Sequence, residues 1–173
     1  MRQMSMEKLG KRIIILGCPG SGKSTFARAL SARTGIPLVH LDNIWWRPDR
    51  THITREEFDL ELEALMRGES WILDGDYSRT YELRFKGCDT VIFLDYSEEE
   101  CVRGVTERLG RKRTDIPWAE DTLDPELMEM VINYRRDNRP EVYSLMERYK
   151  DKRIVIFSTR AQAEDWLNGL CLA

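Results

Sequence analysis

The chain has 173 residues, of which 42% are hydrophobic and 33% charged, and its net charge is −3 at pH 7. This composition excludes a disordered chain and fits one domain with a single core. The small net charge excludes a global field toward nucleic acid, and no apolar run approaches the roughly 20 residues of a membrane span. We expect one cytoplasmic domain over residues 1–173, a monomer or homodimer, with residues 1–11 as a loose tail.

Short runs rich in Ile, Val, Leu and Phe recur along the chain and indicate strands. Such runs are typical of strands buried on both faces, as in a parallel sheet covered by helices. The predicted strands are residues 12–17, 37–42, 70–75, 89–95 and 153–158.

Helical patterns alternate with these runs and have readable starts. Thr54 with Glu57, and Ser97 with Glu100, have the spacing of a capping box. The last helix is predicted to start near Thr159. Strands alternating with helices imply right-handed crossovers and a doubly wound α/β sheet. The apolar stripe of the helix after Thr54 is predicted to be Leu60, Leu62, Leu65 and Met66.

The stretch "GCPGSGKST" lies between the first predicted strand and a predicted helix. It satisfies the G-x-x-x-x-G-K-[ST] pattern of a phosphate-binding loop. Its glycines let backbone N–H groups turn toward an anion, Lys23 supplies a charge for the β- and γ-phosphates, and the Ser24 hydroxyl is placed to ligate Mg²⁺. The residues predicted to hold ATP here are Gly17, Pro19, Gly20, Ser21, Gly22, Lys23, Ser24 and Thr25.

Other nucleotide-binding classes lack their signatures in this sequence. No N/T-K-x-D guanine motif occurs, and no glycine follows an aspartate by three residues, which excludes a GTPase. A motor or chaperone ATPase normally adds a second subdomain, for which the chain is too short. These exclusions favour a small phosphotransferase.

Four segments of the chain carry a resemblance to a known protein family: "IIILGCPGSGKSTFARAL", "IPLVHLDNIWWRP", "WILDGDYSRTYELRFKGCDTVIFLDYS" and "NRPEVYSLMERY". They resemble the bacterial topology modulation protein family, one of the adenylate-kinase-like P-loop kinases. The resemblance implies a three-layer α/β/α P-loop fold, a five-stranded parallel sheet in order 2-3-1-4-5, an acceptor region after the second strand and a short lid at about residues 110–125. The family's name refers to an association with DNA supercoiling, which says little about the reaction that the protein catalyses.

Two aspartates end predicted strands beside this loop. The resemblance implies that Asp74 helps Ser24 to hold Mg²⁺; the alternative is a cap on the following turn. Asp42 favours a hydroxyl acceptor over a phosphate acceptor, because only a hydroxyl benefits from a nearby base. The other predicted acceptor-binding residues are Trp45, Trp46, Tyr77, Arg79 and Arg84, with core packing or solvated helix positions as the alternative roles.

Arginines are numerous around the predicted lid. Arg108, Arg111 and Arg113 are predicted to close over the triphosphate, with Arg135 entering from the far hinge and Arg136 or Arg139 as further candidates. The alternatives are a basic helix end that interacts with its own helix dipole and a weak nucleic-acid patch, which the acidic residues Asp115, Glu120, Asp121 and Asp124 dilute. The resemblance implies that Arg108 and Arg160 flank the adenine.

The sequence therefore predicts a Mg²⁺-dependent kinase that moves the γ-phosphoryl of ATP to a small molecule bearing a hydroxyl. A nucleoside or nucleotide acceptor is the first alternative. A nucleotide-dependent regulatory protein that affects DNA topology is the alternative of another class.

Overall fold

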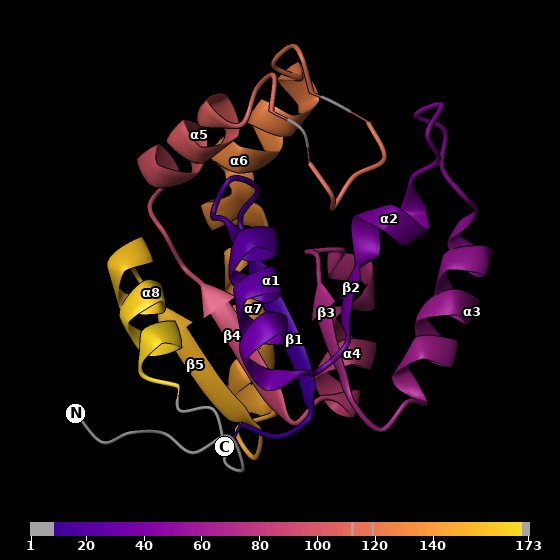
Figure 1. Cartoon of the computed structure of the whole chain (residues 1–173), viewed down its shortest axis with the longest axis vertical. Helices are drawn as coiled ribbons and strands as arrows, with labels where there is room; N and C mark the ends of the chain where they lie inside the picture. Colours follow the sequence, from indigo (N-terminus) through magenta and orange to yellow (C-terminus); the bar gives the residue numbers. More distant parts are fainter. Residues whose placement is uncertain (1–8, 112, 119, 171–173) are drawn as a thin grey trace.

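A computed structural model describes residues 9–111, 113–118 and 120–170. Its centre is one parallel sheet of five strands in the order β2-β3-β1-β4-β5 (Figure 1). The strands are β1 (Arg12–Gly17), β2 (Leu38–His40), β3 (Trp71–Asp74), β4 (Thr90–Leu94) and β5 (Arg153–Phe157). The predicted sheet, its order and the three-layer arrangement are confirmed.

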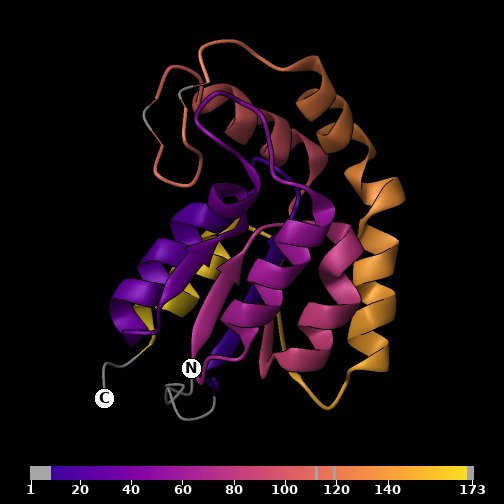
Figure 2. The same ribbon diagram turned by 90° about the vertical axis from the view of Figure 1, so that its right-hand side faces the viewer.

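Helices cover both faces of the sheet. Figure 2 shows α1 (Lys23–Thr34) and α8 (Arg160–Asn168) on one face, with α4 (Tyr81–Gly87) and α7 (Arg139–Arg148) on the other. A short α2 (Leu41–Trp45) and the longer α3 (Arg55–Met66) follow β2, and a 3₁₀ turn, η2 (Ser78–Thr80), precedes α4. Helices α5 (Glu98–Glu107) and α6 (Pro125–Asp137) lie beyond the carboxyl ends of the strands (Figure 1).

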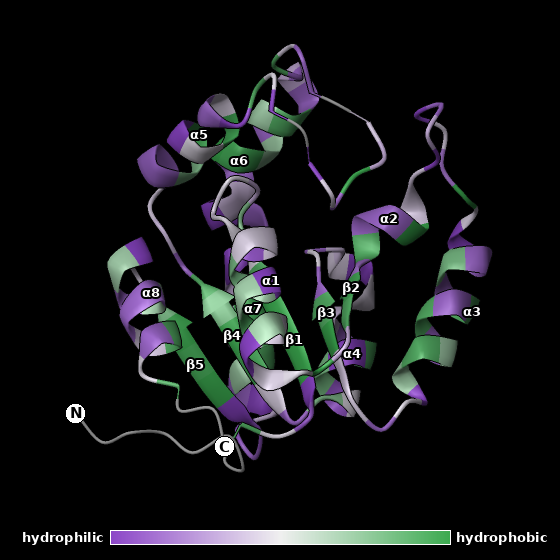
Figure 3. Cartoon of the chain, viewed as in Figure 1, coloured by the Kyte–Doolittle hydropathy of each residue, from purple (hydrophilic) through white to green (hydrophobic). Residues whose placement is uncertain are grey.

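The sheet forms the centre of the hydrophobic core. Ile13, Ile14, Ile15 and Leu16 of β1 are completely buried, and so are Val91, Ile92 and Phe93 of β4. Figure 3 shows these central strands as the most hydrophobic part of the molecule. The buried central strands hold the strand ends from which the site residues emerge.

The helices α3, α5 and α8 start at their predicted N-cap residues. The predicted apolar face of α3 is partly wrong. The capping box of Thr54 and Glu57 is present, and the Ser97 and Thr159 side chains cap α5 and α8. Leu60 of α3 is 68% exposed, and Phe58 is buried instead. The apolar face of α3 therefore runs through Phe58 and Leu62.

Two chain segments depart from their predicted structure. Strand β2 ends at His40, and the chain turns directly into α2, so Asp42 lies in the first turn of a helix and not at a strand end. The predicted loose tail is wrong at Leu9, which is buried and whose carbonyl accepts a hydrogen bond from Thr90 Oγ1. Residues 1–8 lie outside the described residues. Within the described part of the chain, no helix is long and apolar enough to span a bilayer.

Candidate functional site

The phosphate-binding loop joins β1 to α1 with backbone angles that only glycine adopts easily. Gly20 has φ of 85° and Gly22 has φ of 89°. A Cβ on Gly20 would collide with the carbonyl of Cys101 on α5, and one on Gly22 would lie 2.8 Å from Arg160 Nη1. The glycines are therefore required both by the turn and by close packing of the loop.

Lys23, the first residue of α1, folds its side chain back over the loop. Its Nζ donates to the carbonyls of Gly17 at 2.7 Å and Cys18 at 3.1 Å. The ammonium thus lies over the loop that the motif predicts to hold phosphate. Pro19, Gly20, Gly22, Lys23, Ser24 and Thr25 line one large cavity of about 930 Å³, whereas Gly17 and Ser21 do not line it.

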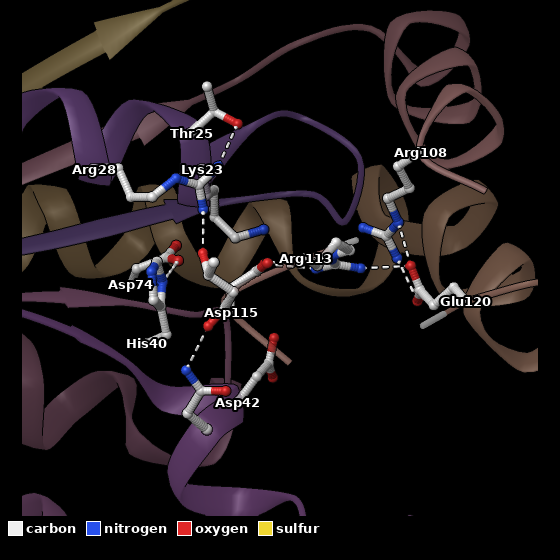
Figure 4. A network of polar contacts seen from close by, with 12 residues as sticks. Lys23, Thr25, Arg28, His40, Asp42, Asp74, Arg108, Arg113, Asp115 and Glu120 are labelled. Carbon is white, nitrogen blue, oxygen red and sulfur yellow. Dashed lines mark hydrogen bonds and ion pairs between the residues drawn. The ribbon is translucent and has the colours of Figure 1, made fainter. Parts of the chain in front are cut away.

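The loop between α5 and α6, residues 108–124, reaches down to this site and is called the lid from here on. Its Asp115 is only 4% exposed and pairs with Arg113 (Figure 4), and the nearby Ser24 side chain, like Arg113, favours the ionised form of this carboxylate. Burial alone would raise the pKa of Asp115, but the hydrogen bonds and charge of Arg113 hold that pKa well below its usual value. A lid carboxylate therefore sits against the serine that the motif predicts to bind metal.

At the end of β3, one carboxylate oxygen of Asp74 lies within hydrogen-bond distance of a side chain, and the other has no partner among the described residues. Its Oδ2 lies 2.6 Å from Nδ1 of His40, while its buried Oδ1 has no hydrogen-bond partner in the described chain (Figure 4). A buried carboxylate oxygen without a partner is costly unless a ligand or water meets it. Asp74 and Ser24 therefore fit a Mg²⁺ ion that takes its other ligands from water and phosphate. Among the residues described, no group of three or more His, Cys, Asp or Glu side chains could hold a metal by itself.

Asp42 on α2 lines the same cavity, across from the phosphate-binding loop. The Tyr77 hydroxyl donates to its Oδ1 at 2.7 Å. Burial raises the pKa of the Asp42 carboxyl, the nearby charge of Asp74 adds to the rise, and the Tyr77 hydrogen bond opposes it. A carboxylate in such surroundings is a better proton acceptor than an exposed one.

Tryptophans form an aromatic wall beside Asp42. The ring of Trp45 stacks on His52 at 4.4 Å and meets Phe58 edge-on at 5.5 Å, so one of its faces belongs to the core. Trp46 contacts Trp118 of the lid edge-to-face at 5.3 Å. All three tryptophans line the cavity. The predicted pair is thus joined by a third ring, which the sequence signalled only as a large aromatic within a polar lid segment.

Two of the predicted acceptor residues point elsewhere. Arg84 is completely buried, and its guanidinium donates to the carbonyls of Gly75 and Asp76, each at 2.7 Å. Arg79 lies on the outside and pairs with Asp59 of α3 at 2.7 Å. Neither side chain lines the cavity, which corrects the prediction that they face the acceptor. Arg84 instead holds the turn that carries Tyr77.

The predicted lid arginines divide into two groups. Arg108, Arg111 and Arg113 line the cavity, and Arg108 and Arg113 share Glu120 as an ion-pair partner (Figure 4). Burial lowers the pKa of Arg108. The remaining arginines point away from the cavity: Arg135 toward the Tyr96 carbonyl, Arg136 to Asp137, and Arg139 to Asp95.

Arg160 at the start of α8 braces the phosphate-binding loop. Its Nη2 donates to the Gly20 carbonyl at 2.8 Å, and its guanidinium lies 5.6 Å from the ring centroid of Tyr96. It also lines the cavity. Arg28 of α1 lines the cavity too, with hydrogen bonds to Thr25 and to Thr114 of the lid. Sequence patterns gave no signal for Arg28, because an arginine on a helix surface is usually solvated.

Known proteins resemble the chain in sequence and in fold. Adenylate kinase of Mycobacterium leprae is 29% identical over 170 residues, covering 82% of this chain and 87% of the relative. Adenylate kinase of Mycolicibacterium smegmatis is 26% identical over 170 residues, covering 81% and 86%.

Solved structures of shikimate kinases share the fold. The enzyme of Acinetobacter baumannii in complex with shikimate superposes with a TM-score of 0.60 at 15% identity, covering 93% of this chain and 90% of that one. The enzyme of Bacteroides thetaiotaomicron gives 0.54 at 19% identity, covering 91% and 94%. The model of the AAA_18 family, described as an AAA domain, matches residues 13–129, which include the phosphate-binding loop, Asp42, Asp74 and the lid. The chain therefore belongs to the AAA_18 family and has the fold of a P-loop kinase.

Proposed function

We propose that this protein transfers the γ-phosphoryl group of ATP to a hydroxyl of a small molecule. The observation that carries the proposal is Asp42, a carboxylate with a raised pKa that lies across one cavity from the phosphate-binding loop. A hydroxyl must lose its proton as it attacks phosphorus, and a carboxylate with a raised pKa accepts that proton readily. An acceptor phosphate is already ionised and needs no base.

In this proposal the acceptor oxygen forms a bond to the γ-phosphorus while the bond to the bridging oxygen of ADP breaks. The hydroxyl proton moves to Asp42. Lys23 and the loop N–H groups hold the phosphates, and the lid arginines Arg108, Arg111 and Arg113 neutralise charge that develops during transfer. Mg²⁺ held by Ser24 and Asp74 would supply charge neutralisation between the β- and γ-phosphates.

Arg160 and Arg108 border the cavity near the loop and are proposed to flank the nucleotide base. The lid is proposed to close over the donor as part of a single domain of residues 1–173. A cytoplasmic location and a monomeric or dimeric state belong to the same proposal, as does membership of the topology modulation protein family.

Phosphorylation of a nucleotide is the alternative, and the adenylate kinase relatives favour it. Such an acceptor needs cations for its own phosphate. Arg79 is paired with Asp59 and Arg84 is buried against backbone carbonyls, so neither supplies that charge. We therefore rank the hydroxyl acceptor first, and the DNA-binding regulator last, since the chain carries a net charge of −3.

The test is ADP release from MgATP, measured with a panel of nucleosides, nucleotides, sugars and polyols. We expect stimulation by a non-nucleotide alcohol. Lys23→Ala should lower the stimulated kcat/KM by about 10²–10³-fold while leaving the fold intact. Lys86→Ala, which changes an exposed lysine of α4, is the matched control and should leave the rate unchanged. Stimulation by nucleoside monophosphates alone would contradict the proposal.

A further inference from the structure

The cavity residues that follow β2 and β3, together with Trp118 of the lid, are called the acceptor wall; they are Asp42, Trp45, Trp46, Asp76, Tyr77 and Trp118. We propose that the acceptor bound there carries a protonated amine in addition to the hydroxyl that receives the phosphoryl group. This inference rests on the proposed function and names the charge of its substrate.

The first support is the pairing state of the carboxylates in the acceptor wall. Asp42 accepts from the neutral Tyr77 hydroxyl at 2.7 Å. Asp76 accepts from the neutral hydroxyl of Tyr134 at 3.0 Å and from the Asn138 amide at 3.5 Å. Among the described residues, neither carboxylate has a cationic side chain as an ion-pair partner. Neither carboxylate is therefore neutralised by a direct ion pair, while Lys23 acts on Asp42 and Arg84 on Asp76 from a greater distance.

The second support is the set of partners that the positively charged side chains of the cavity already have. Lys23 lies over the phosphate-binding loop, and Arg160 donates to the Gly20 carbonyl of that loop. Arg108 and Arg113 are paired with Glu120 of the lid. Arg28 is bonded to Thr25 beside the loop. The cations named here are thus engaged by the phosphate-binding loop or the lid, and none of them makes an ion pair with a carboxylate of the acceptor wall.

The third support is the aromatic composition of the acceptor wall. Ring faces of tryptophan attract cations, and ammonium groups are commonly held between such rings and carboxylates. Trp118 already has a cation near its ring, since Arg50 lies 5.9 Å from its centroid. An anionic acceptor would meet repulsion from Asp42 and Asp76, and a neutral one would gain hydrogen bonds to them without the attraction between opposite charges.

Two acidic side chains extend this pattern at the cavity's rim. Asp124 and Glu126, at the start of α6, line the cavity and are exposed. Asp124 caps the helix through the Glu126 amide, at 2.9 Å, whereas the Glu126 carboxylate makes no ion pair within the described chain. Glu126 therefore offers a charge that can be removed without disturbing the cap.

The experiment compares related hydroxyl compounds that carry a positive, a neutral or a negative group. The probes are D-glucosamine, D-glucose and D-glucuronate, together with the corresponding amine, alcohol and carboxylate forms of a cyclitol and a linear polyol. ADP release from MgATP by the full chain is measured for each. We expect the amine to exceed its neutral parent by at least about tenfold in kcat/KM in any series that reacts, with the carboxylate lowest.

Variants link that preference to the acceptor wall. Asp76→Asn and Glu126→Gln should each reduce the ratio of amine to neutral kcat/KM, and Asp76→Asn should reduce it more. Glu129→Gln changes an exposed carboxylate of the same helix that does not line the cavity, and it should leave the ratio unchanged. Because Glu126 is exposed, its variant keeps the test valid even if Asp76→Asn does not fold.

The outcomes separate this inference from the function on which it rests. Neutral alcohols that react as well as their amines, or carboxylates that react best, would overturn the cationic acceptor and leave the kinase in place. Failure of every hydroxyl compound to stimulate ADP release, while nucleoside monophosphates succeed, would overturn the proposed function and this inference with it. A preference for amines that all three variants retain equally would overturn the assignment to the acceptor wall.

Discussion

Asp42 combines two properties that pull in opposite directions. Its surroundings raise its pKa, chiefly through burial, which improves it as a base. A carboxyl whose pKa is raised on folding stabilises the folded chain below its unfolded pKa, and that contribution is lost as the pH rises through the folded pKa. Around neutral pH, the ionised Asp42 therefore costs stability and is kept for its chemistry.

The variant Asp42→Asn separates these two effects. We expect kcat with a hydroxyl acceptor to fall by about 10²–10⁴-fold, because a general base is lost. The acid limb of the kcat/KM profile, expected above pH 3.8, should disappear with it. Thermal unfolding at pH 7 should occur at a higher temperature than in the unchanged protein, since the amide keeps the bond to Tyr77 without the buried charge. A variant that is both slower and less stable would show that Asp42 is structural.

Arg84 and Arg79 provide a matched pair of arginines near the same turn. Arg84→Met leaves the carbonyls of Gly75 and Asp76 without their buried donor, so we expect the free energy of unfolding to fall by about 3–5 kcal/mol. Arg79→Met removes an exposed ion pair with Asp59 and should cost less than about 1 kcal/mol. Urea denaturation measures both. Equal losses would contradict the positioning role given to Arg84.

At the scale of elements, the lid and the phosphate-binding loop compete for the same groups. Asp115 of the lid lies near Ser24 and pairs with Arg113, yet the proposed reaction needs Ser24 for Mg²⁺ and Arg113 for phosphate. In the proposed function, MgATP therefore has to separate Asp115 from these two residues as it binds.

This exchange predicts the behaviour of Asp115→Asn. Loss of a buried ion pair should loosen the closed lid, so trypsin should cleave near Arg111 and Arg113 at least about tenfold faster without nucleotide. Affinity for MgATP should rise, because less lid contact has to be broken. Asp121→Asn, at an exposed lid position that does not line the cavity, is the control. Unchanged cleavage together with weaker MgATP binding would contradict the competition.

For the molecule as a whole, the sheet was predictable because its central strands β1, β3 and β4 are buried on both faces. The apolar composition of runs such as Ile13 to Leu16 predicts their burial, and the glycines of the phosphate-binding loop predict its positive φ angles. The short α2 was not predictable, because the apolar run around Leu38 continues through Leu41 without a break. The sequence therefore predicted the positions of the strands and helices more accurately than the residue at which β2 ends.

The acceptor side of the site was predictable only in part, for a physical reason. Side chains there are brought together by long-range packing, as when Trp118 of the lid meets Trp46 of α2. Whether an arginine faces a cavity or a set of carbonyls depends on the helix face it occupies, as Arg84 shows. The phosphate-binding side of the site is therefore predictable from a local motif, whereas the acceptor side depends on tertiary contacts that the sequence does not show.

The central claim is transfer of a phosphoryl group to a carbon-bound hydroxyl. The most direct test is ³¹P NMR of a reaction of the full chain with MgATP and the best acceptor of the amine, alcohol and carboxylate panel. The account predicts a new phosphomonoester resonance that grows as the γ-phosphate of ATP disappears, and that is absent with Lys23→Ala. Growth of inorganic phosphate alone, without a phosphomonoester resonance, would contradict it.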